Sequence, residues 1–224
     1  MPIKTPEIIP YGDAAFLIQY AADGYDANIC DTVQSLAKVL HANGYWDEVV
    51  CGYDSVLVAF DPMMMTPLRA RIRICEKIAR LRNNRFSRLR TVEIPVIYGQ
   101  DHGPDMDNIK ESSGLTEQEI VALHSGQTYR VCVMGFVPGF AFLSETPSPL
   151  HHPRHAAPRL SVKAGSVGIA GWQTGVYSLP SAGGWQIIGR TPLKLFDKTR
   201  EEPFLLRAGD QVKFVPETSG AFDD

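Results

Sequence analysis

Short β-rich segments separated by glycine and proline fill the second half of the chain, and they restrict its fold more than any other feature. They lie at residues 129–136, 168–172, 175–179, 185–190, 193–196 and 211–215. Strands this short, with a turn signal every few residues, are typical of antiparallel sheets, because tight turns join antiparallel neighbours. The sequence therefore predicts an antiparallel barrel or sandwich in this part of the chain.

The first ninety residues have a different texture, in which strand-like and helix-like segments alternate. An apolar run at residues 15–20 suits a strand, and residues 49–60 suggest a hairpin. Apolar residues follow helical spacing after Asp26 and again after Thr66. With a further strand predicted at residues 92–98, the order is β-α-β-β-α-β, that of a small split βαβ sandwich. We predict an α+β fold class.

Charge and hydropathy argue against several classes of function. The net charge of −3 gives no overall attraction to nucleic acid or to an anionic membrane. Nine Lys and Arg crowd residues 69–90 around the single acid Glu76, which indicates a solvated helix face, with a partner-protein surface as the open alternative. No apolar run approaches the roughly 20 residues that span a bilayer, and no signal-peptide pattern opens the chain. We expect a cytoplasmic protein that binds neither nucleic acid nor membrane.

Cysteine and histidine spacing argues against a metal centre or a disulfide framework. The four cysteines lie far apart and form no CxxC pair, and each has apolar neighbours, as reduced and buried thiols do. The segment HHPRH at residues 151–155 lacks the helical HExxH arrangement of a zinc site. We predict no metal, and we place His151, His152 and His155 in a surface loop.

Residues 165–175 (GSVGIAGWQTG) hold the densest run of glycines. Glycine lets backbone N–H groups approach a ligand oxygen closely, but a tight hairpin with positive φ angles explains the same pattern. No GK[ST] follows, as a P-loop requires, and no helix follows, as a dinucleotide-binding turn requires. The chain therefore has no recognisable ATP site of its own.

Arg190 is the first candidate for binding an anion. It follows a strand-like run and precedes Thr191 and Pro192, so it lies at a strand end, and a guanidinium suits a carboxylate. The turn before Phe140 presents aromatic rings either to the core or to a ligand. No serine lies in a G-x-S-x-G elbow. The residues alone thus predict a binding cleft but no particular reaction.

Several of these blocks resemble one family. They are GFVPGF at residues 135–140, AGSVGIAGWQTGVY at 164–177 and SAGGWQIIGRTPLKLFD at 181–197, with the PR…APR pair at Arg154 and Arg159. Together they are similar to the family of 5-oxoprolinase B subunits, also called allophanate hydrolase subunit 1 or KipI-like. The resemblance implies a small N-terminal α/β domain and a cyclophilin-like β-barrel. We place these domains at residues 1–90 and 91–224.

The resemblance also implies an enzyme subunit that is inactive alone. It would join two partners, a homologous C-type subunit and a barrel-type subunit of the A type, to open 5-oxoproline to L-glutamate, with ATP used by the complex. One alternative is an inhibitor of a sensor histidine kinase. The other is a carboxyltransferase-type or allophanate-hydrolase-type subunit of urea metabolism.

Positions that match the family's motifs give the candidate site residues. We expect catalytic roles for Arg190, His124 and Gln173, with backbone amides of residues 165–171 helping Arg190 and Gln173 to hold a carboxylate or an oxyanion. His124 either transfers a proton or only packs its helix. The remaining candidates are expected to bind substrate: Phe140, Arg159, Gly165, Ser166, Gly168, Gly171, Thr174, Gly184, Trp185 and Thr191.

Overall fold

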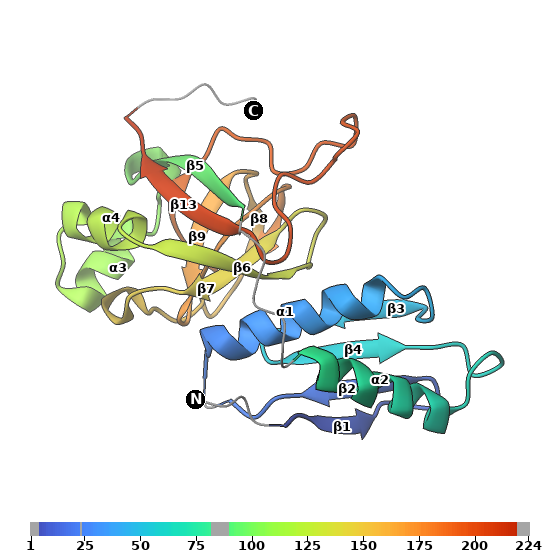
Figure 1. The fold of residues 1–224 in the computed structure, drawn as a ribbon. Coiled ribbons are helices and arrows are strands. Elements are labelled where there is room, and N and C mark those ends of the chain that lie inside the picture. The colour runs from blue at the N-terminus through green and yellow to red at the C-terminus, as the bar shows by residue number, and fades with distance from the viewer. Residues whose placement is uncertain (1–4, 23, 82–89, 219–224) are drawn as a thin grey trace. The chain divides into compact units, whose positions relative to one another are not determined.

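The computed structural model describes residues 5–22, 24–81 and 90–218. The chain divides into two compact units, Met1–Arg88 and Leu89–Asp224 (Figure 1), a division two residues from the predicted domain boundary. Part of the basic stretch seen in the sequence lies outside the described residues. Within the described ranges, no helix is both long and apolar enough to cross a membrane.

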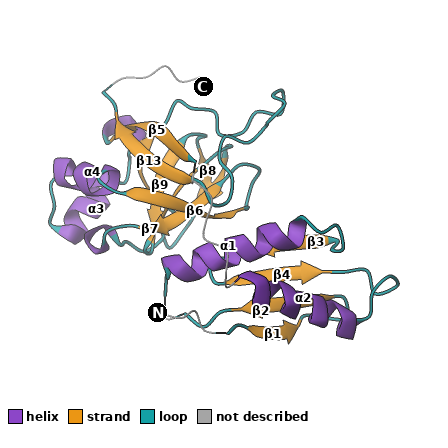
Figure 2. Cartoon of the chain, viewed as in Figure 1, coloured by secondary structure: helices purple, strands orange, loops and turns teal. Residues whose placement is uncertain are grey.

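The first unit is a four-stranded antiparallel sheet with two helices on one face (Figure 2). The strand order is β1-β2-β4-β3, and every neighbouring pair is antiparallel. The elements in chain order are β1 (Glu7–Pro10), β2 (Ala15–Gln19), α1 (Ala27–His41), β3 (Glu48–Cys51), β4 (Ser55–Ala59) and α2 (Pro67–Leu81).

Alternation along the central strands builds the core of this unit. Phe16 and Ile18 in β2 point to the helices, as do Val56 and Val58 in β4, while the residues between them are only partly buried. Helix α1 buries a stripe at helical spacing: Ile29, Val33, Leu36, Ala37 and Leu40. Apolar side chains that recur every second residue in the strands thus pack against apolar side chains that recur every 3.6 residues in the helix, and together they form one apolar layer.

The α+β fold class with a barrel is confirmed, but the predicted order of the first domain is wrong in two places. The unit reads β-β-α-β-β-α, because a strand at Glu7–Pro10 precedes the first predicted one. This strand is short, ends at Pro10 and lies at the edge of the sheet, where proline is tolerated. The strand at Thr91–Tyr98 belongs to the barrel, where it pairs with strands over ninety residues later in the chain.

The second unit is a closed seven-stranded barrel. The order is β10-β7-β6-β13-β5-β12-β9, and β9 closes on β10. Every pair is antiparallel except β5 with β13, which run parallel over six residue pairs. The strands are β5 (Thr91–Tyr98), β6 (Thr128–Met134), β7 (Ala141–Glu145), β9 (Ser166–Ala170), β10 (Gln173–Val176), β12 (Gln186–Arg190) and β13 (Gln211–Pro216).

Short helices and a separate two-stranded sheet complete this unit. Helix α3 packs on β12 and α4 packs on β13, on one side of the barrel (Figure 1). Among the described residues, strands β8 and β11 pair only with each other. Their bounds are α3 (Met106–Ser113), α4 (Glu117–Ser125), β8 (Arg159–Val162) and β11 (Ser181–Gly183), with 3-10 turns at Gln100–His102 and Ser148–Leu150.

The cap of α1 gives a first testable prediction. The Asp26 carboxylate accepts hydrogen bonds from the backbone N–H groups of Asn28 (2.8 Å) and Ile29 (3.2 Å). Removing such a cap costs about 1 kcal/mol, and asparagine caps equally well. We therefore expect Asp26→Ala to lower the free energy of unfolding by about 1 kcal/mol in urea denaturation. Asp26→Asn serves as the control, and an equal loss in that variant would contradict the capping role.

Candidate functional site

Basic side chains gather around one buried carboxylate in the barrel unit. The Asp105 side chain is 3% exposed; Arg159 Nη2 donates to its Oδ1 at 2.5 Å, and His155 Nε2 lies 3.2 Å from the same oxygen. The backbone N–H of Ile187 donates to Oδ2 at 2.6 Å. Burial acts to raise the pKa of Asp105, but these hydrogen bonds together hold it below its ordinary value. Asp105 is therefore ionised and fixes Arg159 in place.

Arg154 supplies a second guanidinium nearby, since the charges of Arg154 and Arg159 both act to lower the pKa of Tyr177 against the effect of its burial. The Arg154 side chain is exposed, and its Cζ lies 5.8 Å from the centroid of the Trp185 ring. Asp105 carries one negative charge against the two guanidiniums of Arg154 and Arg159, so the cluster keeps a positive charge in excess. We name Arg154, His155, Arg159 and Asp105 the arginine cluster. Its chemistry suits a small anion such as a carboxylate.

Three aromatic rings form a floor beside this cluster. Phe140 lies edge-on to Tyr177 at 5.1 Å and to Trp185 at 5.6 Å, and all three side chains are buried. Edge-to-face geometry of this kind stabilises aromatic pairs beyond the area that they bury. Phe140, predicted to bind substrate, thus lies in the core, beneath the ring next to Arg154.

The glycines make room for these rings. Gly168 and Gly175 face each other across β9 and β10, and a Cβ at either would come within about 3.1 Å of Trp185. A Cβ at Gly183 would overlap the Tyr177 hydroxyl. The glycine density noted in the sequence therefore reflects close packing around Trp185 and Tyr177.

Residues 165–171 form a barrel strand and not an anion-binding loop. Ser166–Ala170 is β9, whose backbone pairs with β10 on one side and β12 on the other. Gly165 (φ 82°) and Gly171 (φ 61°) flank it in the left-handed region, as the hairpin interpretation predicts. Because the ladder uses its backbone groups, this segment does not fit the phosphates of ATP. Within the described ranges, no group of His, Cys, Asp or Glu fits a metal ion.

Arg190 ends β12, as predicted, but it is 8% exposed and works within the fold. Its Nε–H donates to the carbonyl of Ala164 at 2.9 Å. The backbone N–H of Thr191 donates to the carbonyl of Gly165, also at 2.9 Å, and Ser166 pairs with Arg190 across the sheet. The structure thus brings these four predicted site residues together, and their contacts hold the turn before β9.

Gln173 lies at the other end of β9. Arg190 pairs with Ser166 at its start, and Gln173 pairs with Ala170 at its end. Ser166 and Ala170 are four positions apart, roughly 13 Å along a strand, so the structure does not bring Arg190 and Gln173 together around one small anion.

His124 lies in the barrel core and joins four elements through one hydrogen-bond chain. Its Nε2 lies 2.8 Å from Thr174 Oγ1, and Thr174 in turn donates to the carbonyl of Gly168 at 3.0 Å. The Thr174 oxygen must therefore accept from Nε2–H, which leaves Nδ1 to accept from the Tyr98 hydroxyl at 2.8 Å. These hydrogen bonds connect helix α4 to strands β5, β9 and β10.

Burial keeps this imidazole neutral. It lowers the pKa of His124 from 6.5 to about 3, and the ring packs against Phe214 at 4.6 Å. Both ring nitrogens have partners, and the side chain is fully buried. The geometry favours the packing interpretation of His124 over proton transfer to a ligand.

Sequence reasoning missed the organising residue of the site. Asp105 precedes α3, and its only local signal is that of an acid before a helix. Its contact with Arg159 joins positions 54 residues apart. His155, assigned to a surface loop, lies in that loop but reaches Asp105.

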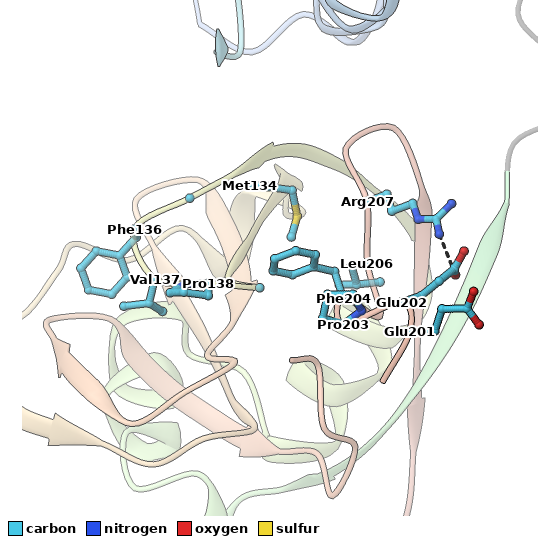
Figure 3. A pocket seen from close by; sticks show the side chains of 12 residues that line it. Met134, Phe136, Val137, Pro138, Glu201, Glu202, Pro203, Phe204, Leu206 and Arg207 are labelled. Atoms are coloured by element: carbon cyan, nitrogen blue, oxygen red, sulfur yellow. Dashed lines mark ion pairs between the residues drawn. The ribbon is translucent and has the colours of Figure 1, made fainter. Parts of the chain in front are cut away.

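An apolar cavity of about 620 Å³ lies on the same unit (Figure 3). Met134, Phe204 and Leu206 point toward one another, and the loop with Val137 and Pro138 faces them. We name this the apolar cavity. It is lined by Met134, Gly135, Phe136, Val137, Pro138, Gly139, Glu201, Glu202, Pro203, Phe204, Leu206 and Arg207.

Comparison with known proteins identifies the family. Residues 6–206 match the family described as carboxyltransferase domain, subdomain C and D. The chain belongs to this family. Its barrel and its helix-covered sheet are therefore features of a carboxyltransferase-type domain, and the likeness noted in the sequence extends over most of the chain.

Curated relatives refine this membership. The B subunit of 5-oxoprolinase from Escherichia coli O157:H7 is 55% identical over 131 residues, or 58% of this chain and 60% of that protein. The protein of the same name from Bacillus subtilis (strain 168) is 46% identical over 140 residues, or 62% and 58%. The chain thus spans about 60% of the length of these relatives. A urea amidolyase of Lachancea kluyveri is 30% identical over 131 residues, 53% of this chain but 7% of that protein.

A solved structure supports the fold. Protein TTHA0988 superposes with a TM-score of 0.82 at 32% identity, over 94% of this chain and 41% of its own. The fold described above therefore forms less than half of that longer chain.

The neutral His124 predicts a pH dependence of stability. Its pKa is lower in the folded state than the usual 6.5, so the unfolded chain binds a proton that the folded chain excludes. The neutral His124 therefore contributes to the free energy of unfolding, and this contribution is complete above pH 6.5. As the pH falls from 6.5 toward 3, the contribution decreases by about 1.4 kcal/mol per pH unit. The measurement is the free energy of unfolding against pH for the wild type and His124→Gln. Parallel profiles between pH 4.5 and 6.5 would contradict the assignment.

The close packing of Tyr177 against Gly183 predicts that alanine substitutions at two adjacent glycines, Gly183 and Gly184, have different effects on stability. Gly183→Ala forces a methyl group into the Tyr177 hydroxyl and should cost about 1–3 kcal/mol. Gly184→Ala is the matched control, since the nearest atom would lie 3.5 Å away. Thermal unfolding of both variants measures the difference, and equal melting temperatures would refute the packing argument.

Proposed function

We propose that this chain is one component of a multi-subunit ATP-dependent 5-oxoprolinase, which opens 5-oxoproline to L-glutamate. The observation that carries the proposal is the 55% identity to a protein named as the B subunit of 5-oxoprolinase, within one domain family. In this proposal the chain is inactive alone and works with a homologous C-type subunit and a barrel-type subunit of the A type. ATP is used by the complex.

The arginine cluster gives this chain a defined part in the reaction. 5-Oxoproline carries a carboxylate beside a planar lactam ring. The guanidinium groups of Arg154 and Arg159 would pair with the carboxylate, while Asp105 keeps Arg159 from turning away. The buried Trp185 ring lies beneath Arg154 and supports its position.

Ring opening adds water across the lactam C–N bond, with the nitrogen leaving as the amino group of glutamate. A lactam is a poor electrophile, so its carbonyl needs activation at the expense of ATP. We assign that step to the partner subunits and assign carboxylate binding to this chain. The bound carboxylate holds the ring in the site, where the partner subunits act on the lactam.

Two assignments made from the sequence remain predictions. Arg190 and Gln173 lie at opposite ends of β9. For either residue to be catalytic, another group would have to act beside it, because the strand pairing does not bring the two residues together. Inhibition of a histidine kinase likewise stays a prediction, while the urea amidolyase likeness covers a small part of that relative.

Reconstitution tests the proposal. The chain is purified with the two proposed partner subunits, and ATP-dependent glutamate release from 5-oxoproline is measured with each component omitted in turn. We expect release only from the complete mixture. Arg154→Ala should raise KM for 5-oxoproline at least tenfold and change kcat less, because the residue binds the substrate's carboxylate away from the bond that breaks.

The control is Lys213→Ala, which removes an exposed cation from β13. Activity without this chain would overturn the proposed function. An unchanged KM in Arg154→Ala would overturn only the carboxylate site.

A further inference from the structure

The loop that follows β6 holds one residue in an unfavourable backbone conformation. Phe136 has φ 70°, and among the described non-glycine residues only Gln100 shares a positive φ. A bulky side chain disfavours this region, so the position costs free energy. The ring is nevertheless 63% exposed, with one edge against Phe140. The fold therefore holds an aromatic ring at the surface under strain.

The strained loop forms one wall of the apolar cavity. Val137 and Pro138 continue this wall, and Phe204 and Leu206 form the opposite one (Figure 3). Phe204 is itself 41% exposed. A cavity of about 620 Å³ with exposed rings at its edge is large enough for one or two apolar side chains of another molecule.

The rim of the apolar cavity is acidic. Glu201 and Glu202 line it together with a single arginine, Arg207, whose Nη2 lies 2.6 Å from Glu202. Both glutamates are exposed. Glu202 is paired with Arg207, so the carboxylate of Glu201 faces solvent beside an apolar surface without being part of this ion pair. A Lys or Arg on another molecule would complement its charge.

This loop is continuous with the aromatic floor of the arginine cluster. The Pro138 carbonyl accepts a hydrogen bond from Ser178 Oγ at 2.6 Å, and the next residue but one is Phe140, whose ring packs on Trp185. A molecule bound at the loop would press on the chain that positions Trp185 beside Arg154.

We propose that the apolar cavity is the docking site of a partner subunit, which inserts an apolar side chain lying next to a Lys or Arg. The proposal rests on the proposed function, since it needs a complex. Charge complementarity with the acidic rim and the strained, exposed Phe136 support it.

Affinity measurements without substrate or ATP test the docking site. Each partner subunit is titrated into the immobilised chain by biolayer interferometry at low and high salt. Phe136→Gly should weaken binding of one partner at least tenfold, yet not lower Tm, because glycine relieves the strained φ. Glu201→Lys should weaken binding at least tenfold at low salt, and this difference should shrink at high salt.

Matched surface changes on the same unit provide the controls. Leu160→Ser removes a 96% exposed apolar side chain from β8, and Glu111→Lys reverses an exposed charge on α3. Neither should change affinity. Unchanged affinity in both Phe136→Gly and Glu201→Lys, or the failure of both partner subunits to bind the wild type, would overturn the docking site. A complex that binds in this way but releases no glutamate would refute the proposed function alone.

Discussion

A neutral imidazole in the barrel core holds the second unit together. Hydrogen bonds run from Tyr98 in β5 through His124 in α4 to Thr174 in β10 and the Gly168 carbonyl in β9. Protonation would put a charge where burial removes water, and it would turn an acceptor into a second donor. The strands of the aromatic floor thus depend on a histidine that never takes a proton near neutral pH.

The site depends on this frame through close packing. Gly168 and Gly175 leave space for Trp185 between strands that the hydrogen-bond chain keeps in register. Trp185 then lies under Arg154, while Asp105 fixes Arg159 from the start of α3. Residues that look catalytic in the sequence, Arg190 among them, build this support. Of the two guanidiniums that we propose bind the anion, the exposed one of Arg154 comes from the loop before β8, and that of Arg159 from the first residue of the strand.

Two surfaces of the barrel unit fit different roles in one proposed complex. The arginine cluster offers positive charge to a small carboxylate, and the apolar cavity offers an acidic rim to a partner protein. The loop of Phe136 and Phe140 runs between them. A partner that binds at one surface would thereby act on the packing beneath the other, which gives a physical route by which assembly promotes substrate binding.

The sequence by itself determined the short strands of the barrel, the α/β character of the first unit and the strand-end position of Arg190. Local patterns encode these features, because turns and periodicity act over a few residues. Only the tertiary structure decided that Thr91–Tyr98 pairs with β13, that Arg190 and Gln173 lie at opposite ends of β9, and that Asp105 meets Arg159. Barrel closure and strand register set these contacts, since they depend on which distant segments pair.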